Sequence, residues 1–367
     1  MKCSRIRIAM EFEEFEVRAQ LVKTEVYHLN PADDVIANAE QEVHYFFIPG
    51  NPGSVYFYLS WLQNFYHRIV QYFDNQFGVG KTACYLHGYS HANHHFKESE
   101  SAENIPSDAH DLSFQIDHSN SFIDAVLKRS NNSINRKRMC IYCGHSIGAY
   151  IILQVLNNAK NLISECISVI LVTPFIAFKQ LPLSQKVFLS LVNASEGFTS
   201  FFANFSRRFL NNIPLVFRKQ LIRKLTAESM DESCSEVIAS RLFTRRLVEN
   251  FLRMGHEEID SVFFNEDLMF SIIKSLSGRV RILSVYTDND VWAPLGDKVI
   301  LDSMPHMHTE FIEGIDHAFS MHYKAHYGVS NVIIKFISDG IRKSGGQNKA
   351  KTSVDVNNTM IIQRARL

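Results

Sequence analysis

The chain has 367 residues, of which 46% are hydrophobic, so it can bury a large core as one domain with an insertion or as two domains. Lysine plus arginine and aspartate plus glutamate number 38 each, which excludes a global field that attracts nucleic acid. Residues 1–10 carry charge without an apolar stretch, so we expect no signal peptide. Apolar runs stay below the roughly 18 residues of a membrane span, which indicates a protein that is soluble or bound to a membrane surface.

The first half of the chain alternates strand and helix patterns. Residues 11–29 alternate apolar and charged side chains, which predicts an N-terminal antiparallel pair of strands. Glu42–Ile48 is apolar enough to be buried on both faces, and it runs into the rigid loop Pro49–Gly53 and then an amphipathic helix. Further strands are predicted near residues 82–86, 139–143, 168–172, 280–286 and 311–312, with helices near 112–127, 149–156 and 327–341.

The pattern changes at residues 174–277, where helical periods rich in Phe, Leu, Arg and Lys replace the strands. This predicts a helical cap inserted between two strands. Residues 1–173 and 278–342 then form an α/β core, a mainly parallel sheet with helices on both faces. Residues 343–367 are polar and poor in apolar side chains, so we expect a disordered tail.

Two groups of residues resemble metal or redox sites. Cys140 and Cys143 form a C-x-x-C pair inside an apolar strand, which is typical of small core residues in a reducing compartment, with a redox pair as the alternative. Four histidines follow the strand near residues 82–86, and we interpret them as a polar loop because no nearby carboxylate or cysteine completes a ligand set. They are His87, His91, His94 and His95. Metal, phosphate-loop and dinucleotide motifs are absent, so no cofactor is expected.

The chemistry centres on Gly144–Gly148, with the sequence Gly-His-Ser-Ile-Gly between an apolar strand and a helical run. This is the context of a nucleophile elbow, in which the turn holds the serine in a strained conformation at the top of a strand. Side chains at the flanking positions would collide with the neighbouring strand and helix, so glycine is needed there. We predict that Ser146 is the nucleophile; the alternative is an ordinary glycine-flanked turn.

A serine hydroxyl needs a base within hydrogen-bond reach and an acid that orients the base. In the α/β-hydrolase order the acid follows the strand after a cap, and the histidine follows the last strand. Asp290 and His317 occupy these places. Asp288 competes with Asp290, but Asp290 has the common spacing of four residues before Pro294, whereas Asp288 fits a turn or cap residue. Other C-terminal histidines are expected at the surface or in packing: His306, His308, His322 and His326.

Negative charge that develops on a carbonyl oxygen is stabilised by two backbone N–H donors. The residue after the nucleophile, Ile147, is expected to supply one of them. The second is expected from the loop after the earlier buried strand, where Asn51 is the candidate. Only its backbone N–H is needed, so the identity of its side chain carries little weight.

Four segments together resemble the lipid droplet-associated hydrolase family over about residues 40–340. They are residues 47–53 (Phe-Ile-Pro-Gly-Asn-Pro-Gly), 144–150 (Gly-His-Ser-Ile-Gly-Ala-Tyr), 290–294 (Asp-Val-Trp-Ala-Pro) and 317–319 (His-Ala-Phe). The first is the most specific, because most α/β-hydrolases have His-Gly there. The resemblance implies an α/β-hydrolase fold and a serine esterase of sterol esters or related neutral lipids, with the catalytic serine, acid and histidine at Ser146, Asp290 and His317.

The same resemblance implies residence on lipid droplets and the endoplasmic reticulum, whose surfaces and neutral lipids would be the partners. The chain departs from the family pattern in Asp288, in the His-rich loop and in the long polar tail.

The cap also suggests a lipid surface without reference to any family. A first stripe of one helix face contains Phe198, Phe201, Phe202, Phe205 and Phe209. A second stripe, Phe217, Leu221 and Leu225, follows Pro214, with Arg and Lys on its other faces. A basic amphipathic helix with bulky aromatic side chains suits a monolayer interface. The alternative is that both stripes pack on the body as a lid core.

Three functions are compatible with these patterns. A serine esterase of lipid esters at a droplet surface uses both the Ser–Asp–His order and the basic, Phe-rich cap. A soluble hydrolase of small esters or thioesters would use the cap as the roof of its pocket. A droplet protein with a vestigial site would act through its surface helices alone.

Overall fold

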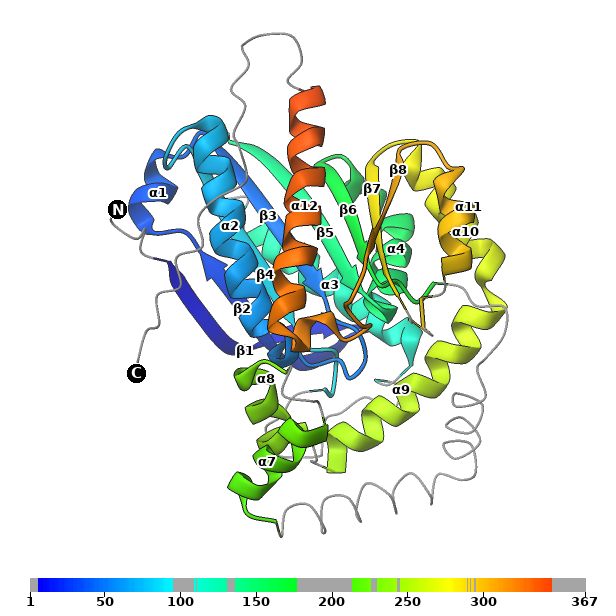
Figure 1. The fold of residues 1–367 in the computed structure, drawn as a ribbon. Helices are drawn as coiled ribbons and strands as arrows, with labels where there is room; N and C mark the ends of the chain where they lie inside the picture. Colours follow the sequence, from blue (N-terminus) through cyan, green and yellow to red (C-terminus); the bar gives the residue numbers. More distant parts are fainter. Residues whose placement is uncertain are drawn as a thin grey trace.

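The structure is a computed structural model that describes residues 6–94, 109, 111–130, 136–176, 213–225, 230–242, 245–288, 290, 292–293 and 295–344. Eight strands form one sheet in the order β1-β2-β4-β3-β5-β6-β7-β8 (Figure 1). The pairs β1–β2 and β2–β4 are antiparallel, and the remaining pairs are parallel. The mainly parallel α/β sheet predicted from the sequence is confirmed.

The elements follow the predicted order. The strands are β1 (Arg7–Val17), β2 (Gln20–Asn30), β3 (Gln41–Ile48), β4 (Thr82–Tyr89), β5 (Lys137–His145), β6 (Cys166–Val172), β7 (Arg281–Thr287) and β8 (Met307–Ile312). The α-helices are α1 (Asp33–Asn38), α2 (Leu59–Phe77), α3 (Leu112–Ser130), α4 (Ile147–Asn158), α7 (Leu215–Leu225), α8 (Glu232–Val237), α9 (Arg245–Phe264), α10 (Glu266–Ser277), α11 (Leu295–Asp302) and α12 (Tyr323–Ser344). Short helical turns are η1 (Val55–Tyr58), η3 (Lys160–Ile163), η4 (Ile238–Leu242) and η5 (Phe319–Met321).

The N-terminal hairpin pairs β1 with β2 in register from Arg7 opposite Asn30 to Val17 opposite Gln20. Its two turn residues, Arg18 and Ala19, both have positive φ, 50° and 61°, as a tight hairpin turn requires. Side chains other than glycine or asparagine rarely adopt this conformation. Helix α3 supplies the compensating contacts, because the Arg18 guanidinium binds Asp117 at 2.7 Å and lies over the Phe114 ring.

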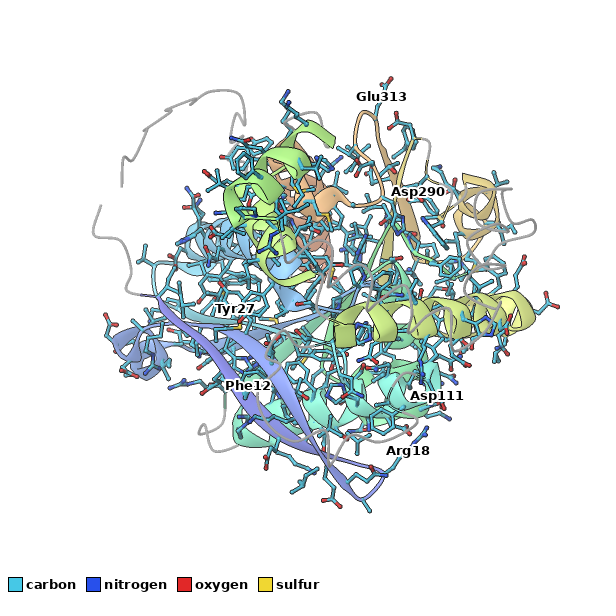
Figure 2. All side chains as sticks on the ribbon, turned by 90° about the horizontal axis from the view of Figure 1, so that it is seen from below. Phe12, Arg18, Tyr27, Asp111, Asp290 and Glu313 are labelled. Atoms are coloured by element: carbon cyan, nitrogen blue, oxygen red, sulfur yellow. The ribbon has the colours of Figure 1, made fainter. Side chains whose placement is uncertain are left out.

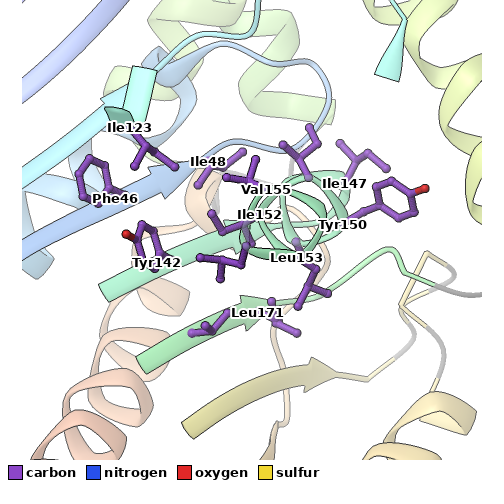
Figure 3. Close-up of a cluster of buried hydrophobic side chains, with 14 of the residues drawn as sticks. Phe46, Ile48, Ile123, Tyr142, Ile147, Tyr150, Ile152, Leu153, Val155 and Leu171 are labelled. Atoms are coloured by element: carbon purple, nitrogen blue, oxygen red, sulfur yellow. The ribbon is translucent and has the colours of Figure 1, made fainter. Parts of the chain in front are cut away.

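Two hydrophobic layers cover the sheet. One layer packs α3, α4, α10 and α11 against one face, and the other packs α2 and α12 against the opposite face. Figure 3 shows the first layer, where Ile147, Ile152 and Val155 of α4 pack with Ile48 and Leu171 of the strands. Because both faces are covered, β3, β5, β6 and β7 are buried along nearly their whole length.

The segment predicted as a cap divides between two positions. Figure 1 shows α7, α8 and α9 gathered beyond one end of the sheet. That end is the carboxyl edge of the parallel strands, since α8 contacts η1 in the chain that follows β3. Helix α10 instead packs on α4, and its Met269 and Ile273 belong to the core layer on the sheet. Residues 177–212 lie outside the described part of the chain, and so does the predicted tail beyond residue 344.

Candidate active site

The predicted elbow joins β5 to α4. Ser146 has φ 53° and ψ −123°, a strained conformation for a residue with a side chain. The flanking glycines are needed for space, because a Cβ on Gly144 would lie 2.3 Å from the carbonyl oxygen of Gly148. A Cβ on Gly148 would lie 2.4 Å from the carbonyl oxygen of Ile48. The elbow is held to the next strand by the Ser146 N–H, which donates to the Val172 carbonyl at 3.1 Å.

The structure brings Ser146, Asp290 and His317 together at the carboxyl edge of the sheet. The Ser146 hydroxyl lies 2.8 Å from His317 Nε2, and His317 Nδ1 lies 2.9 and 2.8 Å from the two carboxylate oxygens of Asp290. A carboxylate can only accept, so Nδ1 carries the hydrogen and Nε2 of the neutral ring accepts the serine proton. We call these three residues the carboxyl-edge relay.

Asp290 is held in place by its own loop. Its Oδ1 atom accepts hydrogen bonds from the backbone N–H groups of Trp292 and Ala293, at 2.9 and 3.0 Å. The carboxylate is fully buried, whereas the His317 side chain is 22% exposed. Figure 2 shows the molecule from below. In this view Asp290 lies at the ends of the strands, and helix α9 runs across the molecule. The relay is therefore anchored on its acid side and open to solvent at the ring.

Asp288 has a different position from Asp290. Its Oδ1 atom accepts from the backbone N–H of Gly314 at 2.7 Å, which ties the loop after β7 to the loop after β8. The structure thus places Asp290, and not Asp288, against His317. Three of the other C-terminal histidines have partners elsewhere: His322 pairs with Asp316, His326 Nε2 donates to the Ser320 carbonyl, and His308 packs on Phe336.

The loop Pro49–Gly53 passes directly over the elbow. A Cβ on Gly50 would lie 2.9 Å from the Ser146 Cβ, so only glycine permits this approach. Asn51, the predicted oxyanion residue, is next in the chain. Ile147, the other predicted donor, is the first residue of α4, where backbone N–H groups have no carbonyl partner within the helix. Both candidates therefore flank Ser146.

The His-rich segment braces this loop. His91 Nε2 donates to the Pro49 carbonyl at 3.0 Å, and His94 Nδ1 accepts from the Gly53 N–H at 3.0 Å. Burial lowers the pKa of His91 to about 3, so its ring is neutral at physiological pH. The prediction of a polar loop needs correction, because β4 continues through His87 to Tyr89, and His91 and His94 are buried. Their spacing gave no signal for this bracing role; His95 lies outside the described residues.

Glu258 reaches the site from the cap, and no sequence pattern predicted it. It lies on α9, is 6% exposed and hydrogen bonds the side chain of Asn51. Burial raises its pKa well above the ordinary value. The Asn51 amide also donates to the Phe251 carbonyl on the same helix, at 2.8 Å. The cap is thus fastened to the predicted oxyanion loop.

The second predicted stripe lies on the surface of the cap. Phe217 and Leu221 of α7 are 59% and 45% exposed, whereas Ile222 packs inward against the core. The first stripe, Phe198 to Phe209, and the side chain of Leu225 lie outside the described residues.

None of the described helices is both long enough and apolar enough to cross a bilayer. Within the same residues, no cluster of His, Cys, Asp and Glu is arranged as a metal site, and Cys140 and Cys143 are buried free thiols.

Comparison with known proteins agrees with this architecture. A model of the lipid-droplet associated hydrolase family matches residues 41–320. The structure is similar to the peroxisomal alpha-beta-hydrolase Lpx1 of Saccharomyces cerevisiae, with 13% identity, a TM-score of 0.61 and coverage of 96% of this chain and 92% of that chain. It is also similar to a thermophilic esterase of Thermogutta terrifontis, with 11% identity, a TM-score of 0.54 and coverage of 90% and 99%. A search of curated proteins gave no match.

The eight-stranded sheet with a serine elbow at its carboxyl edge defines an α/β-hydrolase. Within that class, the chain belongs to the lipid-droplet associated hydrolase family, whose model covers most of its length. The family and the fold expected from the four sequence segments are therefore confirmed.

Proposed function

We propose that this protein is a serine esterase that hydrolyses neutral lipid esters, of sterols or related alcohols, at the surface of lipid droplets. The observation that carries the proposal is the carboxyl-edge relay, in which a hydroxyl on a strained elbow meets a ring oriented by a buried carboxylate. This arrangement leaves a mobile proton next to a nucleophile, which is what acyl transfer requires.

Each residue of the carboxyl-edge relay has a defined part in ester hydrolysis. Ser146 Oγ attacks the ester carbonyl carbon while its proton passes to His317 Nε2, and Asp290 stabilises the imidazolium that forms. The backbone N–H groups of Ile147 and Asn51 stabilise the oxyanion. The C–O bond to the alcohol then breaks as His317 returns the proton to the leaving alcohol. Water, activated by the same ring, attacks the acyl-serine and releases the fatty acid and the free hydroxyl.

Helix α7 supports the lipid surface as the place of action. Val216, Phe217 and Leu221 are all more than 40% exposed, and Arg218, Lys219 and Lys224 lie on the same short helix. Transfer of each large apolar side chain into a monolayer is worth roughly 1.5–3 kcal/mol, and cations favour anionic headgroups. The family resemblance extends the proposal to the surface of the endoplasmic reticulum, which offers the same kind of headgroup layer.

The activity is tested with a fluorophosphonate probe and with three substrates: an emulsified sterol ester, a soluble short-chain ester and a thioester. We expect wild type to be labelled and to prefer the emulsion, and Ser146→Ala to lose labelling and hydrolysis. Ser121→Ala, which alters a half-buried serine of α3 far from the elbow in sequence, is the matched control and should behave as wild type. Preference for the soluble ester or thioester would favour a small-molecule hydrolase. Absence of labelling in wild type would favour the vestigial site.

The surface is tested by flotation with artificial droplets of neutral lipid coated with phospholipid. Replacement of Val216, Phe217 and Leu221 by serine should reduce binding at least tenfold, because three apolar anchors are lost. The matched control replaces three apolar residues elsewhere that are, as a set, at least as exposed, Ile8, Leu21 and Val79, and should float normally. Equal binding of the two triple variants would show that α7 is not the contact.

A further inference from the structure

Tyr58 and His145 connect three separate parts of the candidate site. The Gly50 N–H donates to the Tyr58 hydroxyl oxygen at 3.0 Å, the Tyr58 hydroxyl lies 2.7 Å from His145 Nδ1, and His145 Nε2 lies 2.9 Å from the His317 carbonyl. Tyr58 is 4% exposed and His145 is 5% exposed. The first link begins on the loop Pro49–Gly53, which we call the oxyanion loop. The second link ends on the elbow, and the third ends on the loop that carries His317.

The direction of every link is fixed by chemistry. The His317 carbonyl can only accept, so His145 Nε2 carries the hydrogen. Burial lowers the pKa of His145 to about 3, so the ring is neutral and its Nδ1 atom accepts. The Tyr58 hydroxyl must then donate to Nδ1, and its oxygen accepts from Gly50. Each group has one role, and loss of one link leaves a buried neighbour unpaired.

We propose that Tyr58 and His145 act as positioning residues, which hold the oxyanion loop, Ser146 and His317 in mutual register for the chemical step. The proposal rests on the esterase function proposed above. His145 suits this role because it directly precedes the nucleophile, Ser146, and its ring hydrogen bonds the backbone carbonyl of the base, His317. A shift of about 1 Å between a nucleophile and its base can cost about 100-fold in rate. The tie therefore acts on turnover and not on binding of the substrate.

The alternative is that the two rings serve only as core packing. Tyr58 does pack on Phe47, and His145 on Phe319, with ring centroids 4.6 and 5.2 Å apart. Tyr58→Phe separates the two roles, since it keeps the ring and removes both hydroxyl links. The matched control is Tyr66→Phe on α2, the helix that follows Tyr58; its buried hydroxyl donates to the Cys84 carbonyl at 2.8 Å, away from the site.

Two substitutions of His145 divide the links. His145→Asn keeps an acceptor near the position of Nδ1 but cannot reach the His317 carbonyl. His145→Gln keeps a donor near the position of Nε2 but loses the acceptor for Tyr58. We expect Tyr58→Phe to lower kcat 10- to 100-fold with little change in KM. His145→Asn should also shift the acid limb of the pH profile of kcat/KM, whereas His145→Gln should lower kcat without that shift.

The proposal is overturned if Tyr58→Phe lowers the Tm as Tyr66→Phe does but keeps kcat within twofold of wild type. An inactive wild type would be a failure of the esterase function, and a second measurement then judges the positioning role by itself. The hydrogen between His317 Nδ1 and Asp290, observed as a low-field proton resonance, should exchange with water faster in Tyr58→Phe than in wild type and Tyr66→Phe. Equal exchange in all three would show that the two residues do not position His317.

Discussion

The sheet carries two relays of histidine and carboxylate that are built differently. The carboxyl-edge relay has one ring between a hydroxyl and a carboxylate. On the strands β1 to β4, a second relay joins five side chains, and we call it the histidine chain. Its members are Glu13, His28, His87, His44 and Glu42, with successive distances of 3.2, 2.9, 3.0 and 3.5 Å. A cavity of about 330 Å³ lies beside it.

The ends of the two relays explain why only one suits catalysis. The carboxyl-edge relay ends on the Ser146 hydroxyl, whereas the histidine chain runs from Glu13 to Glu42. The longest link, between His44 and Glu42, is the one bridged by the Ser130 hydroxyl, which donates to Glu42 at 3.0 Å. Burial lowers the pKa of His87 and of His44, which agrees with neutral rings. Both ends of this chain are carboxylates, so no proton is released to a substrate.

Clustered histidines and carboxylates therefore do not make an active site by themselves. The carboxyl-edge relay ends on a hydroxyl that is held on a strained turn beneath a loop of backbone donors. The histidine chain ends on Arg129, which binds both oxygens of Glu13 at 2.9 and 2.6 Å. One relay is directional and open at the nucleophile, whereas the other is saturated at both ends and stabilises the fold.

The largest effect is expected from Asp290→Asn. Loss of the orienting carboxylate should cost about 10⁴-fold in kcat, because the His317 ring loses its tautomer and its stabilised imidazolium. Turnover of a soluble ester by folded protein measures the effect. A loss of less than tenfold would contradict the assignment of Asp290 and remove the contrast between the two relays.

A smaller effect, on stability, is expected from His87→Phe in the histidine chain. The substitution leaves His28 Nδ1 and His44 Nδ1 buried without partners, which should lower the free energy of unfolding by about 2–4 kcal/mol. Urea denaturation measures the loss, and His67→Phe, at an exposed position of α2, is the control. The kcat of folded protein should stay unchanged. A fall in kcat at full stability would give the histidine chain a catalytic role.

Acid should destabilise the fold, because buried histidines outside both relays stay neutral in the folded state. Burial lowers the pKa of His145, which precedes the nucleophile, and of His118 on α3, which hydrogen bonds Thr24 at 2.7 Å, to about 3, below their ordinary values in the unfolded chain. Stability is complete above about pH 6.5, and it falls toward pH 3 because the unfolded chain alone takes up protons. Each ring should contribute a slope of up to about 1.4 kcal/mol per pH unit to the free energy of unfolding.

Urea denaturation of wild type and His118→Gln between pH 7.5 and 5 checks this expectation. The variant lacks one ring that resists protonation, so its stability should decline less steeply with acid. Identical slopes would show that His118 titrates in the folded protein as it does in the unfolded chain.

The smallest effect is expected from Asp288→Asn. The asparagine can still accept from the Gly314 N–H, so we expect a cost of no more than about 1 kcal/mol and a change in kcat below tenfold. Kinetics in parallel with Asp290→Asn give the ranking. If Asp288→Asn were the more damaging substitution, the orienting acid would have to be reassigned.

Much of this protein follows from short stretches of sequence. The strand and helix periods predicted the α/β sheet, because alternation and continuous apolar runs are imposed by the geometry of each element itself. The elbow was recognisable for the same local reason, since Gly144 and Gly148 meet backbone atoms a few residues away or on the adjoining strand. The order of Ser146, Asp290 and His317 was predictable because each follows its own strand at one edge of the sheet.

Tertiary structure decided what depends on contacts between distant residues. The Arg18–Ala19 turn carries no glycine or asparagine signal, and α3 provides the contacts that hold it. The sequence assigned α10 to the cap, yet its apolar face packs on α4. Neither the bracing by His91 nor the burial of Glu258 against Asn51 has a local pattern. A buried polar side chain is satisfied by whichever partner the fold brings within about 3 Å, and sequence spacing does not encode that distance.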